Sequence, residues 1–273
     1  MKKRISVQPS HDKHLFYVIR GNQSSRRVPL VLIHGLCEDH SVWDAVVSAL
    51  EPHGIVCCLD LPGFGQSDPP SSPKMEEYAL ALEALAQEEG FERMAVAGHS
   101  LGGYVTLQSM VELQDKLQGA ILVHSHPFVD SPERAASRLR SIEILEQGHK
   151  ELFVRQLFPN LFAPRYAEEH PEVLEQCIQM GLRQSEVGII TALKTMLNRR
   201  SHLDTLEKFE QPVMAILGDE DKLVPLEDTR RAVERAPRAE VHVLKGVGHM
   251  SMFEASEALS AHILNFWLQL DSY

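Results

Sequence analysis

The chain has 273 residues, of which 44% are hydrophobic and 24% charged, a composition typical of a globular protein with a sizeable core. Its formal net charge of −11 argues against a nucleic-acid ligand, which needs clustered Lys and Arg, and against attraction to anionic membranes. The N-terminus lacks the apolar run of a signal peptide, and no segment is apolar over the length of a membrane-spanning helix. We therefore expect a cytoplasmic protein with no nucleic-acid partner and no membrane span.

Strands and helices alternate in the first half of the chain. Two N-terminal strands are predicted at 4–8 and 14–20, and the next strands are continuous apolar runs, which are typical of strands buried on both faces. Ser41 is the expected N-cap of the first helix. This alternation predicts right-handed crossovers and a mostly parallel sheet. Further strands are predicted at 29–33, 54–60, 93–97 and 119–123, and helices at 42–50, 74–89 and 101–113.

The strand pattern stops between residues 127 and 206. We interpret 127–206 as a helical insertion into one sheet domain formed by 1–126 and 207–273. A separate helical domain on a linker is the alternative, which we favour less because the sheet pattern on each side is too short to form a core alone. Helices are predicted in the insertion at 132–147, 149–158, 171–184 and 186–198, followed by strands at 213–217 and 241–244 and helices at 226–235 and 255–269.

A serine lies at the junction of a predicted strand and a predicted helix. In Gly98-His99-Ser100-Leu101-Gly102, small residues two before and two after the serine allow the sharp turn that exposes its hydroxyl. A glycine-rich turn with an incidental serine is the alternative interpretation. A serine hydroxyl is a poor nucleophile and needs a neighbouring base. We predict that Ser100 is a catalytic nucleophile.

Loops that follow the last two predicted strands supply a base and an acid. His249 lies after two glycines at the carboxyl edge of the sheet, where sites gather in parallel α/β folds, and is the predicted base. Asp221 follows the preceding strand and is the predicted carboxylate that orients the base, with Asp219 as the nearest competitor. We interpret His99 and His34 as structural residues.

Backbone amides are the expected stabilisers of the oxyanion that forms when a carbonyl is attacked. The Leu101 amide lies at a helix N-terminus, and the Leu36 amide follows His34-Gly35. We interpret the arginines of the insertion, Arg134, Arg138 and Arg140 among them, as a solvated helix face, although they could meet a carboxylate. The candidate substrate-binding residues are His124, His126, Phe153, Met180 and Met250.

The motifs together resemble those of the capped α/β-hydrolase superfamily. The resemblance runs in register from about residue 29 to 268, apart from the insertion. It implies an eight-stranded, mostly parallel sheet, a helical cap at 127–206, and neither a cofactor nor a metal. The matching motifs are His34-Gly35, Asp60-Leu61-Pro62-Gly63-Phe64-Gly65-Gln66-Ser67, Gly98-His99-Ser100-Leu101-Gly102-Gly103, Gly218 with Asp221, and Gly248-His249.

Residues at three positions reduce the number of reactions that we expect within this superfamily. Similar dehalogenases and epoxide hydrolases have an Asp nucleophile, whereas Ser100 stands here. Prolyl aminopeptidase-like members carry a Trp where this chain has Leu101, and carbon–carbon bond hydrolases usually carry one where it has Met250. By elimination we expect an esterase that acts on a small-molecule substrate, an uncharged, partly apolar carboxylic ester. A cofactor-free perhydrolase, a carbon–carbon bond hydrolase and a hydrolase-fold ligand receptor with little turnover stay open.

Overall fold

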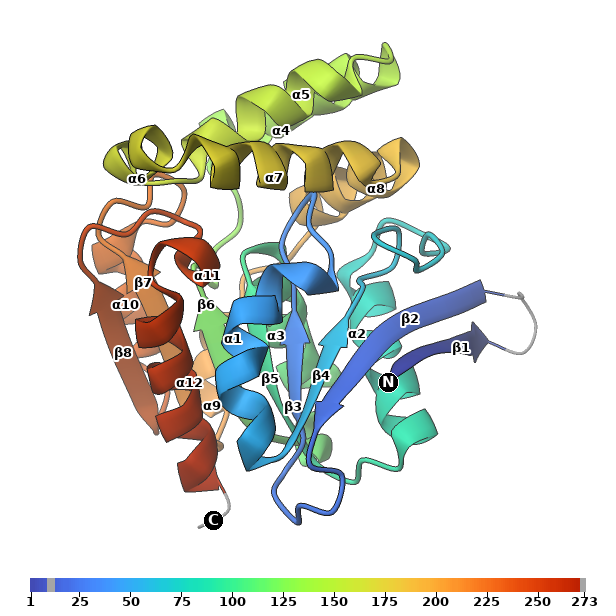
Figure 1. The fold of residues 1–273 in the computed structure, drawn as a ribbon, viewed down its shortest axis with the longest axis vertical. Helices are drawn as coiled ribbons and strands as arrows, with labels where there is room; N and C mark the ends of the chain where they lie inside the picture. Colours follow the sequence, from blue (N-terminus) through green and yellow to red (C-terminus); the bar gives the residue numbers. More distant parts are fainter. Residues whose placement is uncertain (9–12, 271–273) are drawn as a thin grey trace.

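One sheet of eight strands forms the centre of the computed structural model, which describes residues 1–8 and 13–270 (Figure 1). The strand order is β1-β2-β4-β3-β5-β6-β7-β8. β1 and β2 are antiparallel to their neighbours and the remaining pairs are parallel, so the predicted mostly parallel α/β fold is confirmed. The strands are β1 (Lys2–Gln8), β2 (Lys13–Gly21), β3 (Leu30–Ile33), β4 (Ile55–Leu59), β5 (Met94–His99), β6 (Leu117–Val123), β7 (Val213–Gly218) and β8 (Ala239–Leu244).

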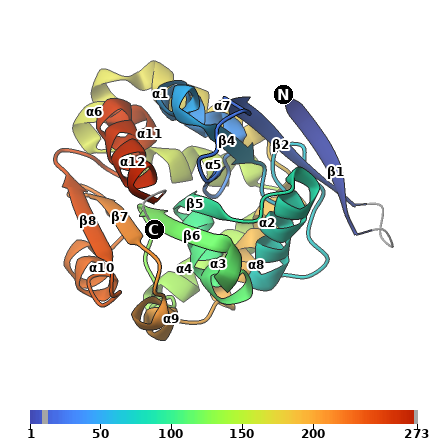
Figure 2. The ribbon, with the colours of Figure 1, turned by 90° about the horizontal axis from the view of Figure 1, so that it is seen from below.

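Helices cover both faces of the sheet (Figure 2). α1 and α12 pack together on one face, and α2, α3 and α10 lie on the other. Every residue of β3, β5, β6 and β7 is therefore buried, which explains their uninterrupted apolar runs. No helix among the described residues is long and apolar enough to cross a bilayer. These helices are α1 (Asp44–Leu50), α2 (Met75–Glu89), α3 (Leu101–Glu112), α10 (Leu226–Val233), α11 (Ser251–Glu254) and α12 (Ser256–Leu270).

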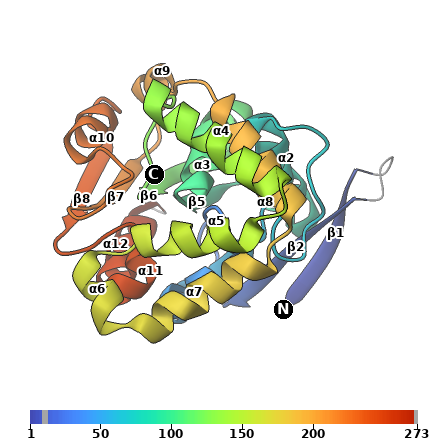
Figure 3. The same cartoon turned by 90° about the horizontal axis from the view of Figure 1, so that it is seen from above.

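The remaining helices lie between β6 and β7. α4 to α8 form a layer over one edge of the sheet (Figures 1 and 3), whereas α9 packs against α3 and α10. The sequence pattern predicted four of these six helices. It missed α6 and α9, because a helix of six residues is too short to show a clear 3.6-residue period. They are α4 (Pro132–Glu146), α5 (Lys150–Leu157), α6 (Pro164–Glu169), α7 (Pro171–Arg183), α8 (Glu186–Leu197) and α9 (Leu203–Lys208).

The predicted start of the first helix is wrong. Asp39, not Ser41, caps the first helical segment, because its carboxylate accepts the Ser41 N–H at 3.0 Å. A 3₁₀ turn from His40 to Trp43 then precedes α1. The last helix, predicted at 255–269, is observed as α12 one residue later, and the short α11 before it was not predicted. Ala255, whose backbone leaves the helical region, separates the two helices.

The inserted helices contact the sheet domain through backbone groups as well as side chains. Gly188 in α8 lies against Gly63 in the loop after β4 so closely that a Cβ atom on Gly188 would lie 1.9 Å from the Gly63 carbonyl oxygen. Nearby, the Gly65 amide donates to Gln184 Oε1 at 2.8 Å. On the other side, the His249 amide donates to the Leu161 carbonyl at 2.6 Å. The insertion is thus joined to the sheet domain at two separated points.

Gly188→Ala tests the close approach of α8 to the sheet domain. The added methyl group meets a backbone carbonyl, so we expect the free energy of unfolding to fall by about 1–3 kcal/mol. This loss opposes the gain of about 1 kcal/mol that alanine brings to an isolated helix. Urea denaturation measures it, with Val187→Ala as a control on an exposed neighbour in the same helix. A Gly188→Ala protein as stable as the wild type would contradict the contact.

Candidate active site

Ser100 occupies a strained turn between β5 and α3. Its backbone has φ 51° and ψ −110°, a region that L-residues rarely adopt. Gly98 and Gly102 make the turn possible, because a Cβ on Gly98 would lie 2.1 Å from the Gly102 carbonyl oxygen. The Ser100 amide donates to Val123 O at 2.9 Å, and the Ser125 hydroxyl donates to Ser100 O at 2.9 Å. The backbone of the turn is therefore held by β6, and the hydroxyl of Ser100 lines a pocket.

Asp221 holds the imidazole of His249. Nδ1 of His249 donates to Asp221 Oδ2 at 2.7 Å, and Oδ1 accepts the amides of Leu223 and Val224 at 2.8 and 3.2 Å. With Nδ1 protonated, the neutral ring carries its lone pair on Nε2. This Nε2 is buried and has no partner among the described residues. His249 lines the same pocket as Ser100, so its open nitrogen is available in the cavity that the serine faces.

The carboxylate of Asp221 is ionised in this setting. Burial opposes its charge, but the electrostatic interaction with His249 and hydrogen bonds from His124 and His249 outweigh burial and hold the pKa of Asp221 well below its usual range. An ionised carboxylate beside Nδ1 favours the orientation of His249 described above and stabilises the imidazolium that forms when Nε2 takes up a proton.

His124 is a second imidazole on the same oxygen. It follows β6 with φ 47°, and its Nδ1 lies 3.2 Å from Asp221 Oδ2. Burial lowers the pKa of His124 to about 4, so the ring is neutral at pH 7 and donates from Nδ1. Donor atoms of His124, Asp221 and His249 lie within 4.8 Å of one another, a spacing that a metal ion could also use. Here both Nδ1–H groups are directed at the carboxylate, and the absence of a metal stays a prediction.

Asp219, the competing acid, lies apart from His249. It is exposed, and its Oδ1 accepts the Gly246 amide at 2.6 Å. It therefore braces the loop that leads to the histidine. Of the two acids that the sequence left in competition, the structure brings Asp221 to the imidazole.

A buried ion pair that was not predicted from the sequence lies beside the candidate active site. Glu38 and His99 have side chains only 1% exposed, with Glu38 Oε2 3.0 Å from His99 Nδ1. His99 Nε2 lies 2.9 Å from the carbonyl oxygen of His249. Both neighbours of the ring are acceptors, so His99 carries both protons. Burial opposes this charge, but Glu38 raises the pKa of His99, and the imidazolium in turn lowers the pKa of Glu38. The structural role predicted for His99 thus takes the form of a link between two loops.

Glu254 is a second residue that the sequence analysis missed. Its Oε2 accepts the amides of Gly248 and Ala163, each at 2.9 Å, and its Oε1 accepts the Met250 amide at 2.9 Å. The carboxylate thereby fixes the residues on both sides of His249 and joins them to the insertion. Two of its partners, Gly248 and Met250, lie six and four positions before it, but the third, Ala163, is 91 positions away in the insertion and could not be predicted from a local pattern.

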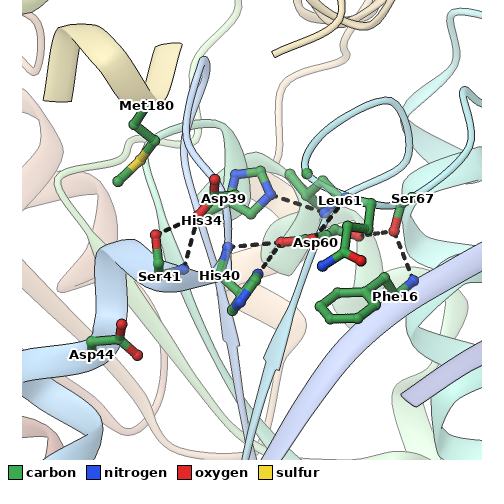
Figure 4. A network of polar contacts seen from close by, with 12 residues as sticks. Phe16, His34, Asp39, His40, Ser41, Asp44, Asp60, Leu61, Ser67 and Met180 are labelled. Carbon is green, nitrogen blue, oxygen red and sulfur yellow. Dashed lines mark hydrogen bonds and ion pairs between the residues drawn. The ribbon is translucent and has the colours of Figure 1, made fainter. Parts of the chain in front are cut away.

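Polar contacts also fix the loop that carries Leu36 (Figure 4). His34 Nδ1 donates to the Gly35 carbonyl at 2.8 Å, and His34 Nε2 accepts the Leu61 amide at 2.9 Å. The buried Asp60 accepts both the amide and Nδ1 of His40 at 2.8 Å. Ser67 donates to the Asp60 carbonyl at 2.7 Å. The loops after β3 and β4 are therefore cross-linked, and His34 braces its loop as expected.

The pocket beside Ser100 has a volume of about 180 Å³, smaller than the 300–1,000 Å³ typical of drug-sized ligand sites. Of the predicted substrate-binding residues, His124 and Phe153 line it, together with Leu36. The amides of Leu36 and Leu101 have no protein acceptor within residues 1–8 and 13–270. Three other candidates lie outside the lining: His126 beside Tyr104, Met180 near Asp39 and Gln184, and Met250 in the core.

The chain is similar to known hydrolases in sequence and in structure. A family profile described as "Serine aminopeptidase, S33" matches residues 24–256. A thermophilic esterase from Thermogutta terrifontis, solved with malate bound, has a TM-score of 0.90 and 25% identity over 99% of both chains. A putative carbamate hydrolase, RutD, from Pantoea ananatis is 25% identical over 93% of both chains. A pimeloyl-[acyl-carrier protein] methyl ester esterase from Yersinia enterocolitica is 25% identical over 87% of this chain and 92% of its own.

His126 predicts a measurable pH dependence of stability. Burial, with the charges of Arg199 and Arg134, lowers the pKa of His126 to about 3 in the folded protein. The unfolded chain takes up this proton near pH 6.5, so stability falls as pH falls from about 6.5 towards 3. His126→Asn, whose amide oxygen can replace Nδ1, should reduce the slope of unfolding free energy against pH by up to about 1.4 kcal/mol per pH unit.

Urea denaturation at pH 6.5, 5.5 and 4.5 measures this slope. His170→Asn is the control, because His170 is exposed beyond α6. Identical slopes for the wild type and His126→Asn would contradict a neutral buried His126.

Proposed function

The chain belongs to the serine aminopeptidase S33 family of α/β-hydrolases, and from this premise we propose that it is a serine hydrolase that cleaves small to medium, partly apolar carboxylic esters through an acyl-enzyme. Ser100 is the nucleophile, His249 the general base and Asp221 the orienting acid. One observation carries the proposal. The buried Nε2 of His249 has no partner in the described part of the chain, while its Nδ1 is held by Asp221, in the pocket that Ser100 lines.

The proposed reaction has two halves. His249 Nε2 takes the hydroxyl proton as Ser100 attacks the ester carbonyl, and the amides of Leu36 and Leu101 stabilise the oxyanion. The imidazolium then gives its proton to the alcohol oxygen, the carbon–oxygen bond breaks, and an acyl-serine remains. Water repeats the attack with His249 as base, which releases the carboxylic acid and restores Ser100.

We assign the helical cap over the active site to residues 127–206 and the catalytic core to 1–126 and 207–273. Pocket residues from α4, α5 and α8 support this division, because they enclose Ser100 from the side opposite the sheet. A closed cap removes water around the developing oxyanion, where fixed donors act more strongly than in solvent. Its small cavity suits short acyl groups.

Ester cleavage fits the relatives better than peptide cleavage, in spite of the family's name. Two of the similar proteins reported above are esterases by name, and one of them acts on a methyl ester. Leu101 and Met250 stand where the aminopeptidase-like and carbon–carbon-cleaving subfamilies carry Trp. Perhydrolysis and carbon–carbon cleavage are distinguished by product analysis, and a ligand receptor by a single burst of product without turnover.

Ser100→Ala should lower kcat for p-nitrophenyl butyrate by about 10⁵- to 10⁶-fold, as expected for the loss of a nucleophile that acts as a unit with its base. A fluorophosphonate should label the wild type on Ser100 and leave the variant unlabelled, as located by mass spectrometry of peptides. Ser48→Ala, on an exposed face of α1, is the control and should keep full activity. Wild-type turnover by Ser100→Ala would end the proposal.

Asp221→Asn and Asp219→Asn form a matched pair that tests the acid. Asparagine can donate to Nδ1 and favours the wrong tautomer of His249, so Asp221→Asn should lower kcat by about 10³- to 10⁴-fold. Asp219→Asn keeps an oxygen for the Gly246 amide and should stay within about threefold of the wild type. Steady-state kinetics on one ester compares them. The opposite order would transfer the role to Asp219.

A further inference from the structure

One helix of the insertion directs a polar face into the pocket. Arg134, Ser137, Arg138 and Ser141 all line the cavity beside Ser100. Their spacing of three, four and seven residues places them on one side of α4, and we call this set the α4 polar face. The sequence alone predicts that these arginines lie on a solvated helix face. A stripe of arginine and serine against a cavity instead offers charged and hydroxyl donors to whatever enters it.

More arginines than carboxylates lie near the α4 polar face. Arg138 makes two hydrogen bonds to Asp130, at 2.7 and 3.2 Å, and the buried Arg199 adds a third at 2.9 Å. Two guanidinium groups therefore share one carboxylate. Arg134 donates to the Leu223 carbonyl, and no carboxylate among the described residues lies within ion-pair distance of it. Three positive charges thus face one negative charge.

Ser100, Glu38, His99 and His249 line the same pocket. The charge of Glu38 is balanced by the His99 imidazolium, so the uncompensated acid in this part of the site is Asp221, which holds His249. The rest of the lining is mostly apolar. A ligand that fits has an apolar part, a reacting group near Ser100 and an anionic group at α4. The apolar lining residues include Leu36, Phe153, Leu157, Leu161, Leu193, Met196, Leu223 and Val224.

We infer that the substrate is a small ester that carries a free carboxylate at the end remote from the scissile bond, and that Arg134 on the α4 polar face binds this carboxylate. The inference rests on the proposed ester hydrolysis and names the substrate class for the same site. Arg134 is the specificity residue because its guanidinium pairs with no acidic side chain of residues 1–8 and 13–270 and so has none to give up. Ser137 also lines the pocket with its hydroxyl, whereas the Ser141 hydroxyl donates to the Ser137 carbonyl at 3.0 Å.

The surroundings of the α4 polar face support a site for an anion. His126 lies near the three arginines, and their charges together with burial keep its ring neutral, as the low pKa described above indicates. Arg199 also packs over the ring of Tyr104, a pocket residue, at 4.2 Å from its centre. Arg138 and Arg199 are thus held in position by carboxylate and aromatic contacts, and Arg134 by the Leu223 carbonyl, before any ligand binds. Fixed donors bind an anion with less loss of side-chain freedom than mobile ones do.

Two esters of the same shape separate charge from size. Monomethyl glutarate carries a carboxylate, and methyl glutaramate carries a neutral amide in its place. We expect the wild type to favour the carboxylate in kcat/KM. Arg134→Gln should lower kcat/KM for monomethyl glutarate by about 10- to 100-fold, the loss typical of a hydrogen bond between charged groups, and mainly through KM. Its rate with methyl glutaramate should stay within about twofold.

Arg134→Lys and Arg140→Gln are the matched controls. Arg134→Lys keeps the charge and should retain part of the preference. Arg140 lies on α4 outside the pocket lining and is exposed, so Arg140→Gln should change neither ester's rate. Arg138 is not substituted, because its loss would also leave Asp130 with one partner fewer. A wild type that prefers the amide, or an Arg134→Gln variant that slows both esters equally, would overturn the inference.

Binding to the Ser100→Ala protein tests the carboxylate site apart from catalysis. Calorimetry should show monomethyl glutarate binding more tightly than methyl glutaramate, and this difference should disappear in Ser100→Ala/Arg134→Gln. Equal binding of the two esters would refute the carboxylate site. If the binding difference is found but the wild type hydrolyses neither ester and takes no fluorophosphonate, the carboxylate site stands and ester hydrolysis fails.

Discussion

The site depends on one buried carboxylate. Asp221 receives four donors, the Nδ1 groups of His249 and His124 and the amides of Leu223 and Val224. A buried carboxylate without such partners costs several kcal/mol, so the meeting of the loops after β6, β7 and β8 at this point also stabilises the fold. This meeting arises because parallel strands bring their carboxyl ends to one edge.

His249 is held by its backbone as well as by its ring. Its amide donates to Leu161 in the insertion, and its carbonyl accepts from His99, the residue before Ser100. Glu254 accepts the amides on both sides of it. The inserted helices, the serine turn and the start of α11 therefore all contact the segment around one histidine. A shift of the insertion would be transmitted to His249 through the Leu161 carbonyl.

The features that could be predicted from sequence are those encoded in short segments. Buried strands appear as apolar runs, and the turn at Ser100 is marked by its glycines. Local patterns therefore predicted the succession of strands and helices along the chain, and also that Ser100, Asp221 and His249 lie together at the carboxyl edge of the sheet. Contacts between distant segments left no such pattern. Glu38 meets His99 sixty-one positions away in the chain. Helical spacing showed that Arg134 and Arg138 share a face, but not that the face lines a cavity.

The most direct test of the central claim is a crystal structure of the protein inactivated by a short alkyl phosphonate. Our account predicts phosphorus bonded to Ser100 Oγ, with the phosphoryl oxygen accepting hydrogen bonds from the amides of Leu36 and Leu101. It also predicts His249 Nε2 within hydrogen-bond distance of the adduct while Nδ1 stays on Asp221. An adduct on another residue, or an imidazole of His249 turned away from Ser100, would contradict it.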